Sequence, residues 1–79
     1  MTKEQAVEAA YSCLVEQVGA ERANTFFVDY AHRHLRYTGS IFDAIYVYRI
    51  EFEDAFGSEY EIEVNGNSGY TVIRDIDLR

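Results

Sequence analysis

The sequence is poor in the residues that build disulfides, zinc sites and cationic surfaces. Its one cysteine, Cys13, has no partner for an internal disulfide, and its apolar neighbours indicate a position on or near a buried helix face. Two histidines, His32 and His34, are fewer than the three or four ligands that zinc requires, so we expect no metal site. Lys and Arg number 7 against 14 Asp and Glu, a formal charge of −7, which disfavours sequence-independent binding to nucleic acid.

Two further absences concern targeting and membranes. The first five residues lack the basic segment and the apolar region of a secretory signal, and no apolar run approaches membrane-spanning length. We therefore expect a cytoplasmic protein with no membrane segment. If the chain is a trimmed fragment, the expectation becomes an envelope or secreted protein.

Catalytic patterns are also missing. Ser, His and Asp occur, but without the context of a nucleophile elbow and without a base at a recognisable spacing. Paired acids such as Glu51 and Glu61 suggest glycosidase chemistry, yet a flat strand surface offers no pocket that would raise the pKa of one of them. We expect no enzyme activity, no catalytic residue and no cofactor.

What is present indicates one small folded domain over residues 1–79. Apolar residues make up 48% of the chain and include 7 Tyr and 5 Phe, a composition typical of a globular protein with an aromatic core. A chain of this length buries only about 60% of its unfolded surface. A shallow binding surface is therefore more compatible with its size than a deep cleft.

The N-terminal segment has the pattern of an amphipathic helix over about residues 3–18. Thr2 is a plausible N-cap, and Gly19 stands where a helix usually ends. Apolar side chains recur between them at spacings of three and four, namely Ala6, Val7, Ala10, Cys13, Leu14 and Val18.

Residues 20–37 fit two patterns. As a helix, they would align Ala23, Phe27, Tyr30, Ala31 and His34 on one side. As a strand, they would alternate one set (Val28, Tyr30, His32, His34) with the other (Asp29, Ala31, Arg33, Leu35). The period alone leaves both open, and Gly39 and Ser40 end the segment in either case.

The C-terminal half has the alternation of an antiparallel meander with strands at about 45–53, 59–64 and 70–76. If Glu53 lies opposite Glu59, then Phe52 pairs with Tyr60, and Ile50 with Ile62. This register also pairs Tyr48 with Val64 and gathers the apolar residues, Tyr46 included, on one face that a helix can cover. The turn Asn65-Gly66-Asn67-Ser68-Gly69 leads into the last strand, at a place where positive φ is needed.

The opposite face of this meander is acidic. It carries Glu51, Glu53, Glu59, Glu61 and Glu63, and in register the last strand would add Asp75 beside Glu59. Like charges directly opposed across a sheet destabilise it, and Arg49 relieves them by facing Glu63.

Several of these segments together resemble the PepSY domain family. The resemblance rests on the helix with Gln5-Ala6-Val7-Glu8-Ala9-Ala10, on the strands Tyr48-Arg49-Ile50-Glu51-Phe52 and Glu59-Tyr60-Glu61-Ile62-Glu63-Val64, and on the turn Asn65 to Gly69. That family shows Tyr-x-Val-x-Phe, Tyr-x-Val-x-Val and Asp-Ala-x-Thr-Gly at these places. Asn65 and Ser68 replace the family's Asp and Thr, and both keep a side-chain acceptor for the turn.

The resemblance implies a cystatin-like α+β fold, with one helix packed on a three- or four-stranded antiparallel sheet. It also implies that residues 26–37 form the first strand. The family is associated with protease propeptides, with peptidase inhibition and with the bacterial cell envelope, and it has no catalytic residues.

Our leading hypothesis is a non-enzymatic protein-binding module, regulatory or inhibitory toward a peptidase. The acidic face of Glu51, Glu53, Glu59, Glu61 and Glu63 would bind a basic patch of the partner. A second hypothesis is a small enzyme, or a binder of a small molecule or metal, that uses a patch of His32, His34 and Arg36. A third is a phage-type inhibitor whose acidic face mimics nucleic acid. Pairing of exposed sheet edges would give a homodimer.

Overall fold

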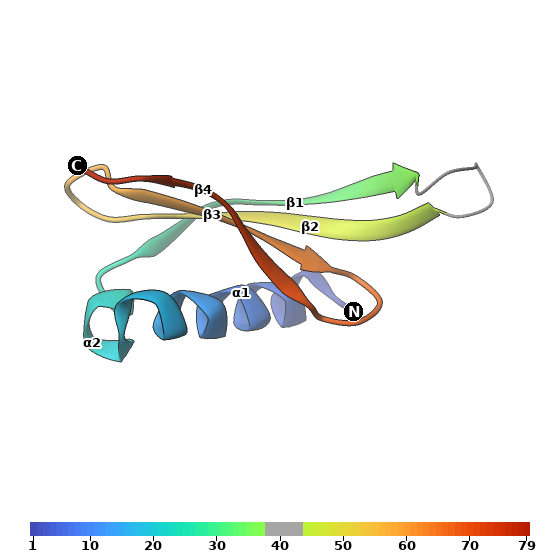
Figure 1. The fold of residues 1–79 in the computed structure, drawn as a ribbon, viewed down its shortest axis with the longest axis horizontal. Helices are drawn as coiled ribbons and strands as arrows, with labels where there is room; N and C mark the ends of the chain where they lie inside the picture. The colour runs from blue at the N-terminus through green and yellow to red at the C-terminus, as the bar shows by residue number, and fades with distance from the viewer. Residues whose placement is uncertain (38–43) are drawn as a thin grey trace.

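The computed structural model describes residues 1–37 and 44–79. Helix α1 (Lys3–Val18) and a short helix α2 (Ala20–Ala23) precede four strands, β1 (Phe27–Tyr37), β2 (Ala44–Glu53), β3 (Glu59–Asn65) and β4 (Thr71–Asp77). The strands form one antiparallel sheet in chain order, and α1 lies across one side of it (Figure 1). The expected α+β architecture is confirmed with four strands. No helix in these two described ranges could span a bilayer.

Helix α1 begins and ends at the residues that its sequence indicates. The Thr2 hydroxyl accepts a hydrogen bond from the Gln5 backbone N–H, and the Gln5 side chain accepts one from the Thr2 backbone, which completes a capping box. At the other end Gly19 has φ +89°, and its N–H donates to the Val15 carbonyl. Ala6, Ala10 and Leu14 form the buried stripe between these caps.

The segment with two possible patterns forms a strand over most of its length. Only Ala20–Ala23 is helical, and β1 then pairs with β2 from Phe27 to Tyr37. A β-bulge at Asp29 shifts the register, so that Val28 lies opposite Phe52 while Tyr30 lies opposite Glu51, on the other face. The alternation from Tyr30 onward is the one that the strand pattern predicts. Gly39 and Ser40 lie outside the described residues.

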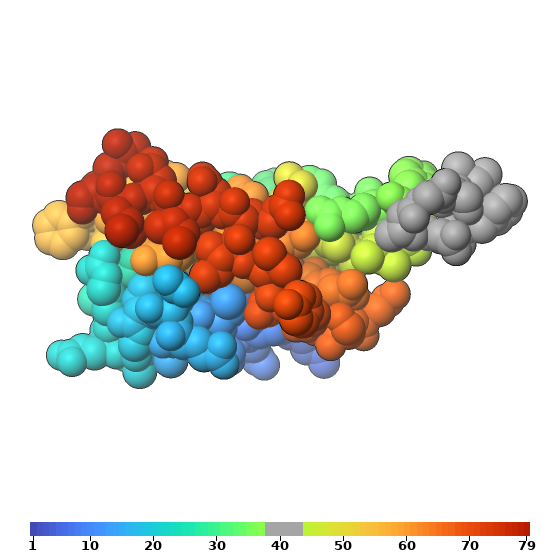
Figure 2. All heavy atoms as spheres, viewed as in Figure 1, coloured from blue at the N-terminus to red at the C-terminus, as the bar shows by residue number. Residues whose placement is uncertain are grey.

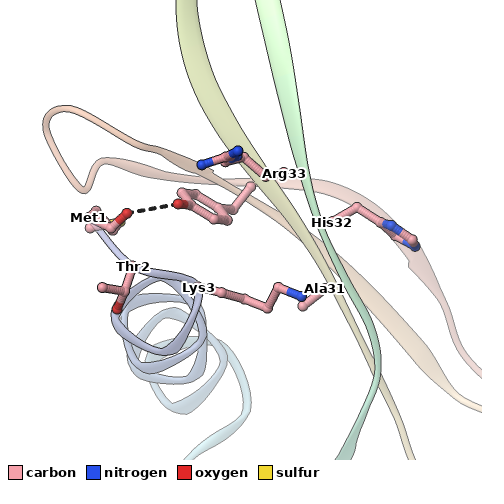
Figure 3. A pocket seen from close by; sticks show the side chains of 7 residues that line it. Met1, Thr2, Lys3, Ala31, His32 and Arg33 are labelled. Carbon is pink, nitrogen blue, oxygen red and sulfur yellow. Dashed lines mark hydrogen bonds between the residues drawn. The ribbon is translucent and has the colours of Figure 1, made fainter.

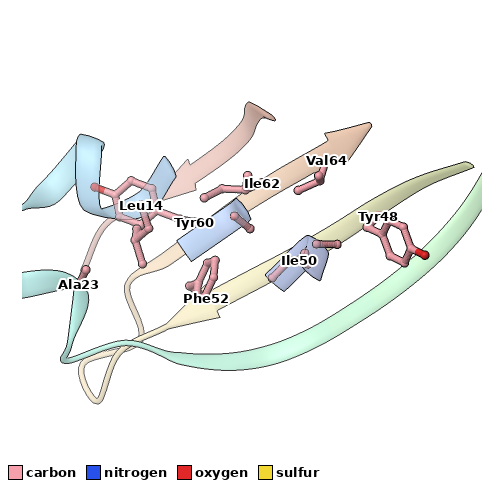
Figure 4. Close-up of a cluster of buried hydrophobic side chains, with 10 residues drawn as sticks. Leu14, Ala23, Tyr48, Ile50, Phe52, Tyr60, Ile62 and Val64 are labelled. Atoms are coloured by element: carbon pink, nitrogen blue, oxygen red, sulfur yellow. The ribbon is translucent and has the colours of Figure 1, made fainter. Parts of the chain in front are cut away.

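The predicted register of the central hairpin is confirmed. Phe52 pairs with Tyr60, Ile50 with Ile62, and Tyr48 with Val64. These side chains are buried beneath α1 together with Leu14 and Ala23 (Figure 4), on the side of the sheet that we call the helix face. The opposite side is the outer face.

Tyr46 does not belong to this core, contrary to the sequence prediction. It lies on the helix face opposite Leu35, and 48% of its surface is exposed. The reason is the length of β3, which ends at Asn65, opposite Val47. Beyond that point the β1–β2 hairpin continues as a two-stranded projection (Figure 2). Tyr46 is two residues from Tyr48 and so lies on the same face of the strand, as the sequence predicts. The sequence pattern did not indicate that the core ends before Tyr46.

The register of β4 also differs from the sequence prediction. Asp75 pairs with Glu61, and Asp77 takes the predicted place beside Glu59. A bulge at Arg74 accounts for part of the shift, because it adds one residue to β4 between the partners of Glu61 and Ile62. The bulge places Ile73 and Ile76, three residues apart, on the same helix face.

The turn between β3 and β4 depends on Asn65 and two glycines. The Asn65 Oδ1 accepts hydrogen bonds from the backbone N–H groups of Asn67 and Ser68, and the Ser68 hydroxyl accepts one from Tyr70. Gly69 has φ +77°, whereas Gly66 is required by space. Its N–H donates to the Tyr46 carbonyl oxygen at 2.7 Å, and a Cβ there would lie 2.6 Å from the same oxygen.

We predict that Gly66→Ala lowers the free energy of unfolding by about 1–3 kcal/mol, because the backbone of β2 must move away from the new methyl group. Urea denaturation followed by circular dichroism measures this. Asn67→Ala, in the same turn but exposed, is the matched control and should change stability by less than about 0.5 kcal/mol. Equal stability of the two variants would contradict the close approach of Gly66 to Tyr46.

Candidate functional site

The outer face joins the two sets of residues that the sequence analysis kept apart. Strand β1 places Tyr30, His32, His34 and Arg36 beside β2, with His32 opposite Arg49 and Tyr30 opposite Glu51. Since directly paired residues of an antiparallel sheet share a face, the histidine patch and the acidic face form one surface. The predicted pairs Glu51–Glu61, Glu53–Glu59 and Arg49–Glu63 are all present.

The centre of this surface is held by internal pairs. Glu63 is buried and accepts two hydrogen bonds from the Arg36 guanidinium, with Arg49 Nε 3.7 Å from its Oε1. The Tyr30 hydroxyl donates to Glu61, and burial, followed by this bond, raises the pKa of Tyr30. Glu61, Glu63, Tyr30, Arg36 and Arg49 form the paired centre. Its carboxylates are committed to stabilising the sheet.

The end of the outer face next to the β2–β3 loop is acidic. The carboxylate oxygens of Glu51, Glu53 and Glu59 lie within 4.8 Å of one another. Among the described residues, none of the three forms an ion pair with Lys, Arg or His. We call these three residues, with the neighbouring Asp29 and Asp77, the acidic end. The pKa of Glu51 is raised mainly by burial, and then by the negative charges of Glu59 and Asp29. The pKa of Glu53 is likewise raised mainly by burial, and then by the charges of Asp29 and Glu59.

The three residues of the predicted histidine patch lie on one face of β1, but only the two histidines lack an ion-pair partner among the described residues. The rings of His32 and His34 lie on one face, 6.1 Å apart between centroids, with the Tyr30 ring 4.9 Å from His32. Arg36, the third member of the predicted patch, is bound to Glu63. Arg33 extends from the opposite face, where its guanidinium lies 4.6 Å from the centre of the Tyr46 ring. The basic segment is thus divided between two sides of the sheet.

Sequence reasoning missed Asp54, which organises the turn after β2. Its Oδ1 accepts hydrogen bonds from the N–H groups of Phe56 and Ser58, and its Oδ2 lies 3.3 Å from the Arg22 guanidinium. The side chain is buried, and it joins α2 to the end of the sheet that carries Glu53 and Glu59. An Asp followed by Gly57 in a short loop is a turn signal that could have indicated this role.

We predict that Glu63→Gln lowers the free energy of unfolding by about 1–2 kcal/mol, because it removes the buried charge that both arginines face. This loss is smaller than is usual for breaking a fully buried ion pair, because the Arg36 and Arg49 side chains are 38% and 40% exposed and water replaces part of the interaction. Urea denaturation provides the measurement. Glu53→Gln is the control and should cause no loss, so an equal loss in both variants would contradict the division of this face.

The acidic end should make stability depend on pH. A carboxyl group whose pKa is raised above its ordinary value near 4.5 binds protons more readily in the folded than in the unfolded protein. Above the raised pKa such a group is charged, and its repulsion with neighbouring carboxylates lowers the free energy of unfolding. As the pH falls through the raised pKa, the group is protonated and this destabilisation is relieved. We predict that the Glu51→Gln, Glu53→Gln double variant gains less stability than wild type between pH 7 and about pH 5.

Urea denaturation at pH 7, 6 and 5 gives the slope of the free energy of unfolding against pH for wild type and for the double variant. The Glu8→Gln, Glu16→Gln double variant makes the same charge change on exposed positions of α1 and should keep the wild-type slope. A Glu51, Glu53 variant with the wild-type slope would show that these carboxylates do not repel one another.

Comparisons with protein-family models, with curated proteins and with solved structures give no match for this chain. The resemblance to the PepSY family therefore stays a prediction from the sequence. The geometry of the outer face is the main basis for a functional proposal.

Proposed function

We propose that this chain is a non-enzymatic protein-binding module whose acidic end binds a cationic segment of a partner protein. One observation carries the proposal: Glu51, Glu53 and Glu59 converge within 4.8 Å, without an ion-pair partner among the described residues. Neighbouring Glu61 and Glu63, by contrast, are paired internally. Glu63 is thus neutralised by arginines and Glu61 is hydrogen-bonded within the sheet, whereas Glu51, Glu53 and Glu59 have no ion-pair partner in the part of the chain that the structure describes.

The repulsion at the acidic end favours a cationic ligand. Burial is the largest cause of both raised pKa values, and the charges of neighbouring carboxylates add to it; a Lys or Arg side chain would offset the part that comes from those charges. With a formal charge of −7, the chain also attracts such a partner over longer distances, which accelerates association and makes it sensitive to salt.

A protein is a better ligand for this surface than a metal ion. The three carboxylates are on regular, paired strands, whereas strong calcium sites use a loop that wraps the ion with six to eight oxygens. The PepSY resemblance makes a peptidase with a basic surface the first candidate partner.

The test uses a fluorescently labelled peptide of four lysines alternating with serines as the probe, with anisotropy measured from about 25 to 300 mM NaCl. At the lowest salt, the Glu51→Gln, Glu53→Gln double variant should bind about three- to tenfold more weakly than wild type, with a shallower dependence on salt. The Glu8→Gln, Glu16→Gln variant, which has the same net charge, should bind within about twofold of wild type.

Equal losses in both double variants would mean that net charge alone attracts the peptide. Wild-type affinity in the Glu51, Glu53 variant would remove the acidic end as the binding surface. A pull-down from native lysate with the same three proteins then tests the peptidase: it should be retained by wild type and by the Glu8, Glu16 control, and lost from the Glu51, Glu53 variant.

A further inference from the structure

The projecting part of the β1–β2 hairpin leaves an apolar surface uncovered on the helix face. We call this part the arm; its described residues are Leu35–Tyr37 on β1 and Ala44–Tyr46 on β2. Leu35, Tyr37 and Tyr46 are 46%, 57% and 48% exposed. The arm extends beyond α1 (Figures 1 and 2), and the β3–β4 turn reaches it only at its base, where the Gly66 N–H donates to the Tyr46 carbonyl.

A cleft of about 590 Å³ opens at the base of the arm, between the first turn of α1 and strand β1. Thr2, Lys3, Ala31, Arg33 and Tyr48 line it (Figure 3). The Tyr48 hydroxyl donates to the Met1 carbonyl at 2.7 Å and fixes one wall. The His32 ring points away, toward the outer face (Figure 3).

The cleft is cationic, although the chain as a whole is strongly acidic. Lys3 comes from α1 and Arg33 from β1, and both line the cleft. In Figure 3 the Lys3 ammonium lies beside Ala31, whereas the Arg33 guanidinium lies above the Tyr48 ring. Within the described ranges, neither forms an ion pair, and Arg33 stacks over the Tyr46 ring at 4.6 Å. The acidic end lies across the sheet on the outer face.

We propose that the cleft and the arm together bind an acidic, apolar peptide segment of a protein partner. A carboxylate of the segment would face Arg33, with Lys3 adding to the positive potential of the cleft, and its apolar side chains would cover Leu35 and Tyr37. A small free anion would gain little from two solvent-exposed cations, so the ligand needs the adjoining apolar contact. This site is separate from the acidic end and does not depend on the function proposed for it.

The spacing of the arm favours an extended peptide. Arg33, Leu35 and Tyr37 are every second residue of one strand face, about 6.6 Å apart. An extended peptide repeats its own side chains at the same interval, so an acid at one position and apolar residues two and four positions later match the three in order.

The probe is a labelled five-residue peptide with glutamate, leucine and phenylalanine at its first, third and fifth positions and serine between them. We expect it to bind wild type at 150 mM salt, and Arg33→Gln and Lys3→Gln each to weaken binding about three- to tenfold. In spectra of the ¹⁵N-labelled protein, the amide shifts should concentrate at Lys3, Ala31, Arg33 and Leu35. The acidic end should not respond.

Two controls complete the design. Arg74→Gln removes one exposed charge from β4 and should bind the peptide within about twofold of wild type. A peptide with glutamine in place of glutamate should bind as weakly as the Arg33 variant binds the original. The proposal would be overturned if the peptide did not bind, or if Arg74→Gln weakened its binding as much as Arg33→Gln does. It would also be overturned if sodium acetate bound as tightly as the peptide, or if the amide shifts were centred on Glu51.

Discussion

The structure depends on a mismatch between one helix and the sheet it covers. The 16 residues of α1 span about 24 Å, whereas the 11 residues of β1 span about 36 Å. The helix therefore covers one face of the sheet, and only part of its length. The outer face and the arm must both remain stable in water, and they do so by different means.

The outer face is stabilised by pairing where pairing is possible. Arg36 and Arg49 from two strands neutralise Glu63, and Tyr30 reaches Glu61, so that half of the surface needs no partner. Glu51, Glu53 and Glu59 lie toward the other end, where β1 supplies Asp29 in place of a cation. Their mutual repulsion lowers stability without serving the fold, which is what the binding role that we propose for them would explain.

Much of this could be predicted from the sequence, because strand alternation fixes the face of every residue once one pair is known. The pairing of Glu53 with Glu59 follows from the short loop between them and gives the whole β2–β3 register. The pairing of β1 with β2 has no such local signal, so the sequence favours pairing of the basic segment 33–37 with the acidic face but does not identify Glu63 as the partner of Arg36. The bulges at Asp29 and Arg74 change the register without a distinctive residue, and the exposure of Tyr46 depends on where a neighbouring strand ends.

The same features bear on how the chain meets other molecules. Both edge strands carry a bulge and charged residues, Arg33 and Arg36 on β1 and Asp75 and Asp77 on β4, and such features hinder pairing of edges between copies. With the edges protected, contacts fall to the two faces of the sheet. Alternation along the strands sends Arg33 to the helix face and Glu51 to the outer face. A thin sheet with one helix can thus carry an anionic cluster on one face and a cationic cleft on the other, which is the basis for the two partner segments of opposite charge that we propose.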